Sequence, residues 1–206
     1  MTDARHAPAT MRNRQPLAEV FRRVLPAKAR VLEVASGTGE HAVYFASELD
    51  VIWQPSDADP DALRSIEAHR LASTDPDVSG GVRCRPPIAI DASAVPWAIE
   101  ADAVDAIVCI NMIHISPWEA SAGLFQNAGA LLSPGAPLLT YGPYRVNGEQ
   151  TSASNVKFEG WLHSLDPGFG VRDIDDLRTV ATAAGLVLDA RVPMPANNFT
   201  LVWRKE

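Results

Sequence analysis

The segment RVLEVASGTGE at residues 30–40 constrains the fold more than any other part of the chain. Its first six residues predict a buried strand, and the turn Ser36-Gly37-Thr38-Gly39 follows directly, before a helix expected at 40–48. Glycine has no Cβ, so such a turn lets backbone N–H groups approach a ligand at the start of a helix. The same turn can also serve tight strand-to-helix packing, so a binding site needs support from other positions.

Apolar strand-like segments alternate with amphipathic helical ones along most of the chain. Further strands are expected near residues 50–56, 82–90, 104–110 and 137–141, and helices near 17–25, 59–69, 116–132 and 173–185. Residues 186–192 and 199–204 predict two last strands that follow each other around a turn at 194–198. This order predicts one α/β domain with a doubly wound, mostly parallel sheet and an antiparallel strand at its edge.

Proline and capping residues set the expected helix boundaries. A loose tail at residues 1–11 precedes a first helix that holds Pro16 in its first turn. Asp59 and Asp173 are expected to cap helices, and Ser116–Glu119 has the spacing of a capping box. Residues 73–81 are polar and predict a surface loop.

Composition excludes several classes of protein. The chain has 206 residues, with 18 Lys and Arg against 25 Asp and Glu, a net charge of −7 and 47% hydrophobic residues, which disfavours disorder and nucleic-acid binding. The 2 cysteines, Cys84 and Cys109, cannot form a disulfide framework or a zinc knuckle. Without a signal-like or membrane-spanning segment, a cytoplasmic location and no membrane partner are expected.

Acidic residues follow two of the expected strands. Asp57 lies 20 residues beyond Gly37 and is placed to accept hydrogen bonds from ribose hydroxyls. Asp91 is placed to accept from an adenine amino group, with the Ala92 N–H beside it. Asp57 could instead merely precede a helix that Asp59 caps, and Asp91 could be an ordinary turn aspartate. Together with the glycine turn they predict a nucleoside-containing ligand at the carboxyl edge of the sheet.

The fourth strand ends in Asn111-Met112-Ile113-His114. Asn111 and the Met112 backbone are expected to line the ligand, and His114 is a candidate general base, although a lone histidine in a loop is more often structural. A nicotinamide dinucleotide would require a third glycine where the chain has Ala42. Glu33 and Glu40 would repel a pyrophosphate but attract the cationic groups of S-adenosylmethionine.

A family resemblance extends from about Arg12 to Lys205. The motifs VLEVASGTGEHA, WQPSD, INMIHISPWEA, GLFQNAGALLSPG, YGPYRVNG, SNVKFE, GVRD and MPANN resemble the methyltransferase-like 26 family, catalogued as domain of unknown function 938. The resemblance implies a Rossmann-like, seven-stranded class I methyltransferase fold and S-adenosylmethionine binding. Here Ala35 replaces the usual first glycine of the motif. The family supplies no acceptor.

The strand-end residues and the resemblance together give the candidate site residues. Cofactor contacts are expected from Asn13, Glu33, Ala35, Ser36, Gly37, Thr38, Gly39, Asp57, Asp91, Ala92, Asn111 and Met112. Catalytic roles are expected for His114, Tyr141 and Tyr144, and substrate contacts for Asn147, Asn155, Asn197 and Asn198. Residues 1–28 are expected to form a tail and lid helix, and 145–172 a substrate-side insertion in a single domain of 1–206.

The sequence thus predicts methyl transfer from S-adenosylmethionine to a small molecule. The alternatives are a cofactor-binding scaffold or sensor without catalysis, and an NAD(P)-dependent oxidoreductase, which lacks support from a Tyr-x-x-x-Lys pair. No metal site is predicted, and the oligomeric state is left open.

Overall fold

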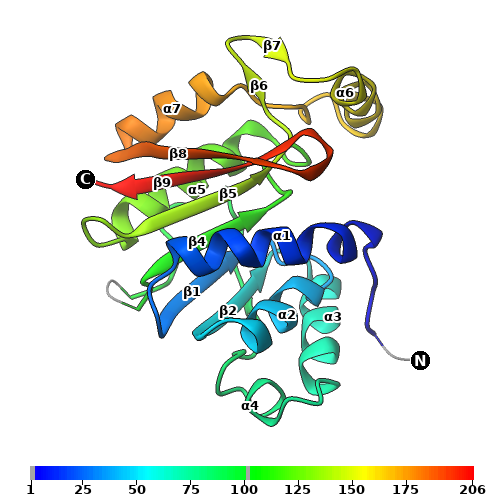
Figure 1. Cartoon of the computed structure of the whole chain (residues 1–206), viewed down its shortest axis with the longest axis vertical. Helices are drawn as coiled ribbons and strands as arrows, with labels where there is room; N and C mark the ends of the chain where they lie inside the picture. The colour runs from blue at the N-terminus through cyan, green and yellow to red at the C-terminus, as the bar shows by residue number, and fades with distance from the viewer. Residues whose placement is uncertain (1–2, 101–102) are drawn as a thin grey trace.

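The computed structural model describes residues 3–100 and 103–206, and within them one α/β layer structure (Figure 1). Its central sheet has seven strands in the order β3-β2-β1-β4-β5-β9-β8. The strands are β1 (Ala29–Val34), β2 (Val51–Asp57), β3 (Ile88–Ala89), β4 (Ala106–Ile110), β5 (Pro137–Gly142), β8 (Leu186–Met194) and β9 (Asn198–Lys205). This confirms the single-domain, mostly parallel, doubly wound sheet.

The one strand that runs against the others lies inside the sheet. β9 pairs antiparallel with both β5 and β8, so β8 forms the edge and runs in the direction of the parallel strands. The expected edge position of the antiparallel strand is therefore wrong. The connection between β8 and β9 is a short 3₁₀ turn, Pro195–Asn197, in which Ala196 and Asn197 have positive φ. β9 lies between β5 and β8 in the sheet.

Helices cover both faces of the sheet. They are α1 (Pro8–Val24), α2 (Glu40–Glu48), α3 (Pro60–Leu71), α4 (Pro76–Ser79), α5 (Trp118–Leu131), α6 (Ala153–Leu165) and α7 (Ile174–Ala183). α1 and α2 bury Phe21 and Phe45 against Trp53 on one face, while Phe125 of α5 packs on Trp203 on the other. None of the helices within 3–100 and 103–206 is both long and apolar enough to cross a bilayer.

The first helix begins earlier than expected. It starts at Pro8, so Pro16 lies inside it and residues 8–11 are helical instead of a tail. The first two residues of that predicted tail, Met1 and Thr2, lie outside the described residues. Proline at the first helical position needs no N–H partner, and the buried stripe with Leu17 and Phe21 holds the helix together across Pro16.

Other boundaries were partly right. Asp59 and Asp173 cap α3 and α7 as expected, by accepting the N–H of Asp61 and Asp175. The capping box at Ser116 is wrong, because α5 begins at Trp118 and the Ser116 hydroxyl contacts the Met112 sulfur instead. The polar stretch 73–81 contains α4 with Val78 buried beneath it, and only Ile88–Ala89 of segment 82–90 pairs as a strand.

The segment 145–172 carries its own structure. A small hairpin of β6 (Arg145–Val146) and β7 (Glu149–Gln150) leads into α6, which Ser152 caps by accepting the Asn155 N–H. In Figure 1 the hairpin and α6 stand beyond the end of β5, beside the β8–β9 turn. The insertion therefore adds a wall at the carboxyl edge of the sheet.

Candidate functional site

A groove runs along the carboxyl ends of β1, β2 and β4. It consists of two adjoining cavities of about 370 and 570 Å³, which share Ala35, Asp57, Met112 and Ile115. The first also contains Glu33, Gly37 and Asn111, and the second contains Asp91 and Ala92. These volumes are those of small-molecule sites, and the position is where doubly wound sheets bind ligands.

The turn after β1 is strained and closely packed. Ala35, Gly37 and Gly39 all have positive φ, of 58°, 58° and 87°. A Cβ at Gly39 would lie 2.5 Å from the Cα of Ile66 in α3, whereas a Cβ at Gly37 would meet no atom within 4 Å. Gly39 is therefore required for helix packing, and Gly37 leaves space on the groove side. Ala35 holds a conformation that a side chain disfavours.

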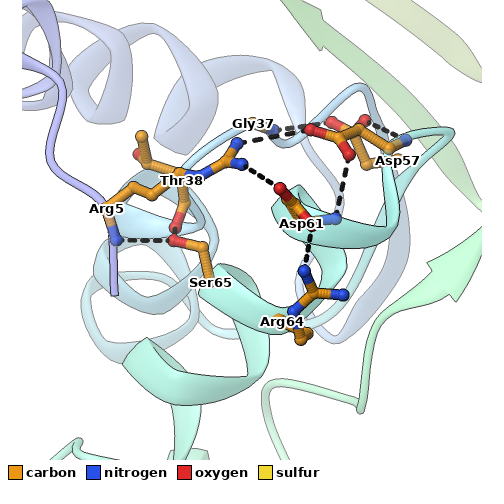
Figure 2. A network of polar contacts seen from close by, with 8 residues as sticks. Arg5, Gly37, Thr38, Asp57, Asp61, Arg64 and Ser65 are labelled. Atoms are coloured by element: carbon orange, nitrogen blue, oxygen red, sulfur yellow. Dashed lines mark hydrogen bonds and ion pairs between the residues drawn. The ribbon is translucent and has the colours of Figure 1, made fainter. Parts of the chain in front are cut away.

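Asp57 ties the end of β2 to this turn. Its Oδ2 accepts the Gly37 N–H at 2.9 Å and its Oδ1 accepts the Asp59 N–H at 3.0 Å (Figure 2). Ser36 strengthens the same junction, because its backbone N–H donates to the Ser56 carbonyl at 2.8 Å. The Asp57 carboxylate is thus oriented at the groove wall, where a sugar hydroxyl can donate to its second lone pairs.

Glu33 is the most buried acid of the groove. It is 1% exposed, and its Oε2 accepts a hydrogen bond from Trp53 Nε1 at 3.0 Å. Burial raises the pKa of Glu33 to about 7, against the opposing effect of the Trp53 hydrogen bond. A positively charged ligand group in the first cavity would favour the ionised carboxylate.

The second cavity gathers the residues that follow β3 and β4. Asp91 Oδ1 accepts from the Ser93 N–H at 2.8 Å and the Ser93 hydroxyl at 2.7 Å, and these bonds lower the Asp91 pKa. Met112 is 7% exposed and lines both cavities, and its neighbour Asn111 lines the first cavity. Asn111 has φ of 62°, which turns the chain sharply after β4.

Sequence reasoning missed an N-terminal strap, residues 3–6, that lies against the groove. The Arg5 N–H donates to Ser65 Oγ at 2.8 Å, and that hydroxyl donates to the Thr38 carbonyl at 2.8 Å. Figure 2 shows the Arg5 guanidinium reaching from the strap to the start of α3, where it pairs with Asp59 and Asp61. The strap leads into Ala7, Ala9 and Thr10, which line the first cavity. Isolated arginines in a polar tail gave no signal for this contact.

A polar cluster joins α1 to the ends of β5 and β9. His41 Nε2 lies 2.8 Å from Asn13 Oδ1, and the Asn13 and Asn198 side chains lie close to the Tyr141 hydroxyl, where they lower its pKa against the effect of burial. Burial raises the Tyr141 pKa, and it lowers that of His41 to about 4, so both are neutral near pH 7. His41 lines the first cavity, a position that its place in a helix did not reveal.

His114 is buried beside this site. The side chain makes an edge contact with Phe158, and a Cβ at Gly142 would lie 2.9 Å from its Nδ1. Burial, with the Arg172 guanidinium nearby, lowers the His114 pKa to about 3. A base this weak accepts a proton poorly at neutral pH, so the location argues against the expected general-base role.

Tyr144 lies in the hydrophobic core. It is 1% exposed and belongs to the cluster that contains Leu138 and Trp203. Among the described residues its hydroxyl meets Thr140 without a hydrogen bond of normal geometry. This burial argues against the expected contact with an acceptor, because the spacing from Tyr141 turns the two rings to different surroundings.

The four asparagines expected to contact substrate lie in two places. Asn155 Nδ2 donates to the Asn197 carbonyl at 3.3 Å, which joins α6 to the β8–β9 turn that also holds Asn198. Asn147 is exposed in the β6–β7 turn with φ of 54°. Three of the four therefore gather at one wall, and Asn147 stands apart from them. Their substrate contacts stay predictions.

A comparison with known protein families shows the family to which the chain belongs. The model of DUF938, a protein of unknown function, matches residues 4–205. The chain belongs to the DUF938 family. The match includes residues 4–6 of the strap and all strands of the central sheet.

Solved structures share the fold of this DUF938 protein at low identity. The mitomycin 7-O-methyltransferase MmcR is 15% identical with a TM-score of 0.76, over 96% of this chain and 54% of that one. An O-methyltransferase family protein from Burkholderia thailandensis is 17% identical with a TM-score of 0.76, over 96% and 57%. The S-adenosylmethionine-dependent methyltransferase SibL, in its apo form, is 18% identical with a TM-score of 0.74, over 96% and 55%. The chain spans little more than half of each, and the likeness shows that it shares their Rossmann-like α/β fold.

Proposed function

We propose that this DUF938 protein transfers a methyl group from S-adenosylmethionine to a small-molecule acceptor. The observation that carries the proposal is the groove itself, in which Glu33 and Asp57 flank the Gly37 turn at the carboxyl edge of the sheet. The proteins of similar fold are named as methyltransferases, which supports the same chemistry.

The residues of the groove fit this cofactor. Two carboxylates line the first cavity, and the space beside Gly37 admits a ligand close to the backbone. Asp57 would accept from ribose hydroxyls, Glu33 would face the ammonium group, and Asp91 with Ala92 would bind the adenine. Such an arrangement would repel the pyrophosphate of a dinucleotide, which disfavours the oxidoreductase alternative.

When bound, S-adenosylmethionine would supply a methyl group on a sulfonium ion, for transfer to the acceptor atom as the bond from carbon to sulfur breaks and S-adenosylhomocysteine is released. The protein would bind the cofactor and the acceptor, align them with each other and exclude water from the site. Tyr141 is the candidate for orienting the acceptor, because its hydroxyl lies close to the Asn13 and Asn198 side chains at the end of β5. With His114 buried and weakly basic, an acceptor that attacks as a neutral amine or a thiolate suits this site best.

Cofactor binding is tested by calorimetry with S-adenosylhomocysteine, beside a titration with NADH. We expect saturable binding of the first only, and at least about a tenfold loss, roughly 1.4 kcal/mol, in Asp57→Asn. Asp189→Asn serves as the matched control, because it alters an exposed ion pair between Asp189 of β8 and Arg204 of β9. Binding weaker than about 1 mM, roughly −4 kcal/mol, would contradict the proposal.

A cofactor-binding protein without catalysis is the second candidate. It is favoured by the burial of all three predicted catalytic side chains, since His114 and Tyr141 are each 4% exposed and Tyr144 is 1% exposed. Incubation of the protein and deuteromethyl S-adenosylmethionine with a metabolite extract separates the two functions. Label that appears in a small molecule only with active protein supports the enzyme; cofactor binding with no labelled product supports the sensor.

A further inference from the structure

Two imidazoles and a carboxylate converge beside the strap, outside the groove. His6 comes from the strap, Glu40 from the first turn of α2 and His69 from the last turn of α3. One ligand atom from each of the three lies within 4.8 Å of the other two. Three elements that are distant in sequence thus present metal-ligand atoms to one small volume.

The spacing is close to that of a tetrahedral site. His6 Nδ1 and Glu40 Oε1 are 2.9 Å apart, and the two imidazole centroids are 5.1 Å apart at an interplanar angle of 86°. Zinc bonds of about 2.0–2.1 Å imply ligand atoms roughly 3.3 Å apart in a tetrahedron. The His6 side chain is 72% exposed, so it can move the short distance required by rotation about its own bonds.

Neighbouring groups orient the ligands. Glu40 Oε2 accepts the Ala7 N–H at 2.7 Å and the Thr38 hydroxyl at 3.1 Å, which leaves Oε1 directed at His6. His69 Nε2 is 2.7 Å from the Arg5 carbonyl oxygen, which brings a further oxygen atom close to the three side chains. Partners of this kind fix the orientation of ligating side chains in metal sites.

We propose that His6, Glu40 and His69 bind one divalent transition-metal ion of the zinc class, and that the ion fastens the strap to α2 and α3. Two imidazoles and one carboxylate suit zinc, nickel or copper better than magnesium or calcium, which prefer oxygen ligands. Cys84 and Cys109 are buried elsewhere and offer no competing surface thiol.

The consequence concerns the groove wall. The strap continues into Ala7, Ala9 and Thr10, which line the first cavity, so an ion at His6 restrains the chain directly before these residues. Metal binding therefore reduces the opening of this wall. This inference stands independently of the proposed chemistry, because the ligands lie outside the groove residues that hold the cofactor.

The test uses the full chain, stripped with a chelator and dialysed against Zn²⁺ alone. We expect one ion per chain, with affinity reduced about tenfold or more in His6→Ala and in His69→Ala. His163→Ala, which removes an exposed histidine of α6, is the matched control and keeps the affinity. Unfolding by urea without metal verifies that each variant is folded.

Trypsin supplies a second readout that does not depend on cofactor or activity. Cleavage after Arg5 is expected to slow several-fold when Zn²⁺ is added to the wild type, and to be unaffected by Zn²⁺ in His6→Ala. The proposal is overturned if zinc fails to bind at one per chain, if His163→Ala loses as much affinity as His69→Ala, or if bound zinc leaves the cleavage rate unchanged.

Discussion

The Trp53 indole donates a hydrogen bond to the Glu33 carboxylate at 3.0 Å, from the second strand to the first beneath the groove. Burial raises the Glu33 pKa from 4.5 to about 7. Between these two values the folded protein holds a proton that the unfolded chain releases. The contribution of Glu33 to the free energy of unfolding is therefore fully present below pH 4.5, and it is lost as the pH rises through 7.

Replacing Glu33 by glutamine removes this pH dependence. The amide still accepts from Trp53 and never ionises, so we expect Glu33→Gln to be more stable than wild type at pH 8, by up to about 3 kcal/mol. The difference should shrink to within about 1 kcal/mol at pH 5. Urea unfolding at the two pH values measures it. The exposed Glu149→Gln on β7 should change nothing, and an equal effect of Glu33→Gln at both pH values would refute the account.

The two glycines of the turn differ in what they support. Gly39→Ala places a Cβ 2.5 Å from the Ile66 backbone, so we expect a loss of at least about 2 kcal/mol in urea unfolding. Gly37→Ala meets no neighbour and should cost only about 1 kcal/mol for its positive φ, while weakening S-adenosylhomocysteine binding in calorimetry about tenfold or more. Equal stability losses in the two variants would show that the packing against α3 is not decisive.

Ala35 occupies a backbone position that favours glycine. Its φ of 58° is disfavoured for a side chain, so we expect Ala35→Gly to leave stability unchanged or raise it by as much as about 1 kcal/mol. The control Ala68→Gly, inside α3, should lose about 0.5–1 kcal/mol in the same thermal or urea unfolding. A comparable loss in both variants would mean that Ala35 carries no strain.

The two tyrosines near the end of β5 provide a matched pair. Tyr141→Phe removes a buried hydroxyl that lies close to the Asn13 and Asn198 side chains, and we expect it to lose about 1 kcal/mol of stability and to loosen the contact of α1 with β9. Tyr144→Phe removes a poorly paired hydroxyl from the core and should be neutral or stabilising. Urea unfolding, together with hydrogen exchange in α1, distinguishes them. A larger loss in Tyr144→Phe would reverse this assignment of roles.

The sheet was predictable because its signals are local. The apolar segment of β1 and the glycine turn after it, like the capping residues Asp59 and Asp173, act over a few residues and were recovered. The position of β9 between β5 and β8 was not, because strand order depends on which edge offers free backbone groups and an apolar face. Residues 8–11 joined α1 for a similar reason, since Thr10 is buried against distant parts of the chain.

The candidate site shows the same division. Strand-end residues such as Asp57 and Asn111 follow from topology, since parallel strands bring their carboxyl ends to one edge. Burial depends on tertiary packing, so the sequence could not predict two of the observed positions. His114 is buried in contact with Phe158, and Tyr144 is part of the hydrophobic core. The contacts of Arg5 and His6 span 34 to 64 positions in the chain, from His6 with Glu40 to Arg5 with His69, and no short motif records them.

The two chain ends lie at opposite ends of the sheet. The strap holds Arg5 against Ser65 at the groove, whereas the Glu206 N–H donates to the Gly185 carbonyl at the far end of β8 and β9. A purification tag fused before Met1 would therefore extend from the wall of the groove, and a polyhistidine tag there would compete with His6 for the proposed metal ion. A tag after Glu206 would project away from both sites, so binding measurements on this protein belong with carboxy-terminal fusions.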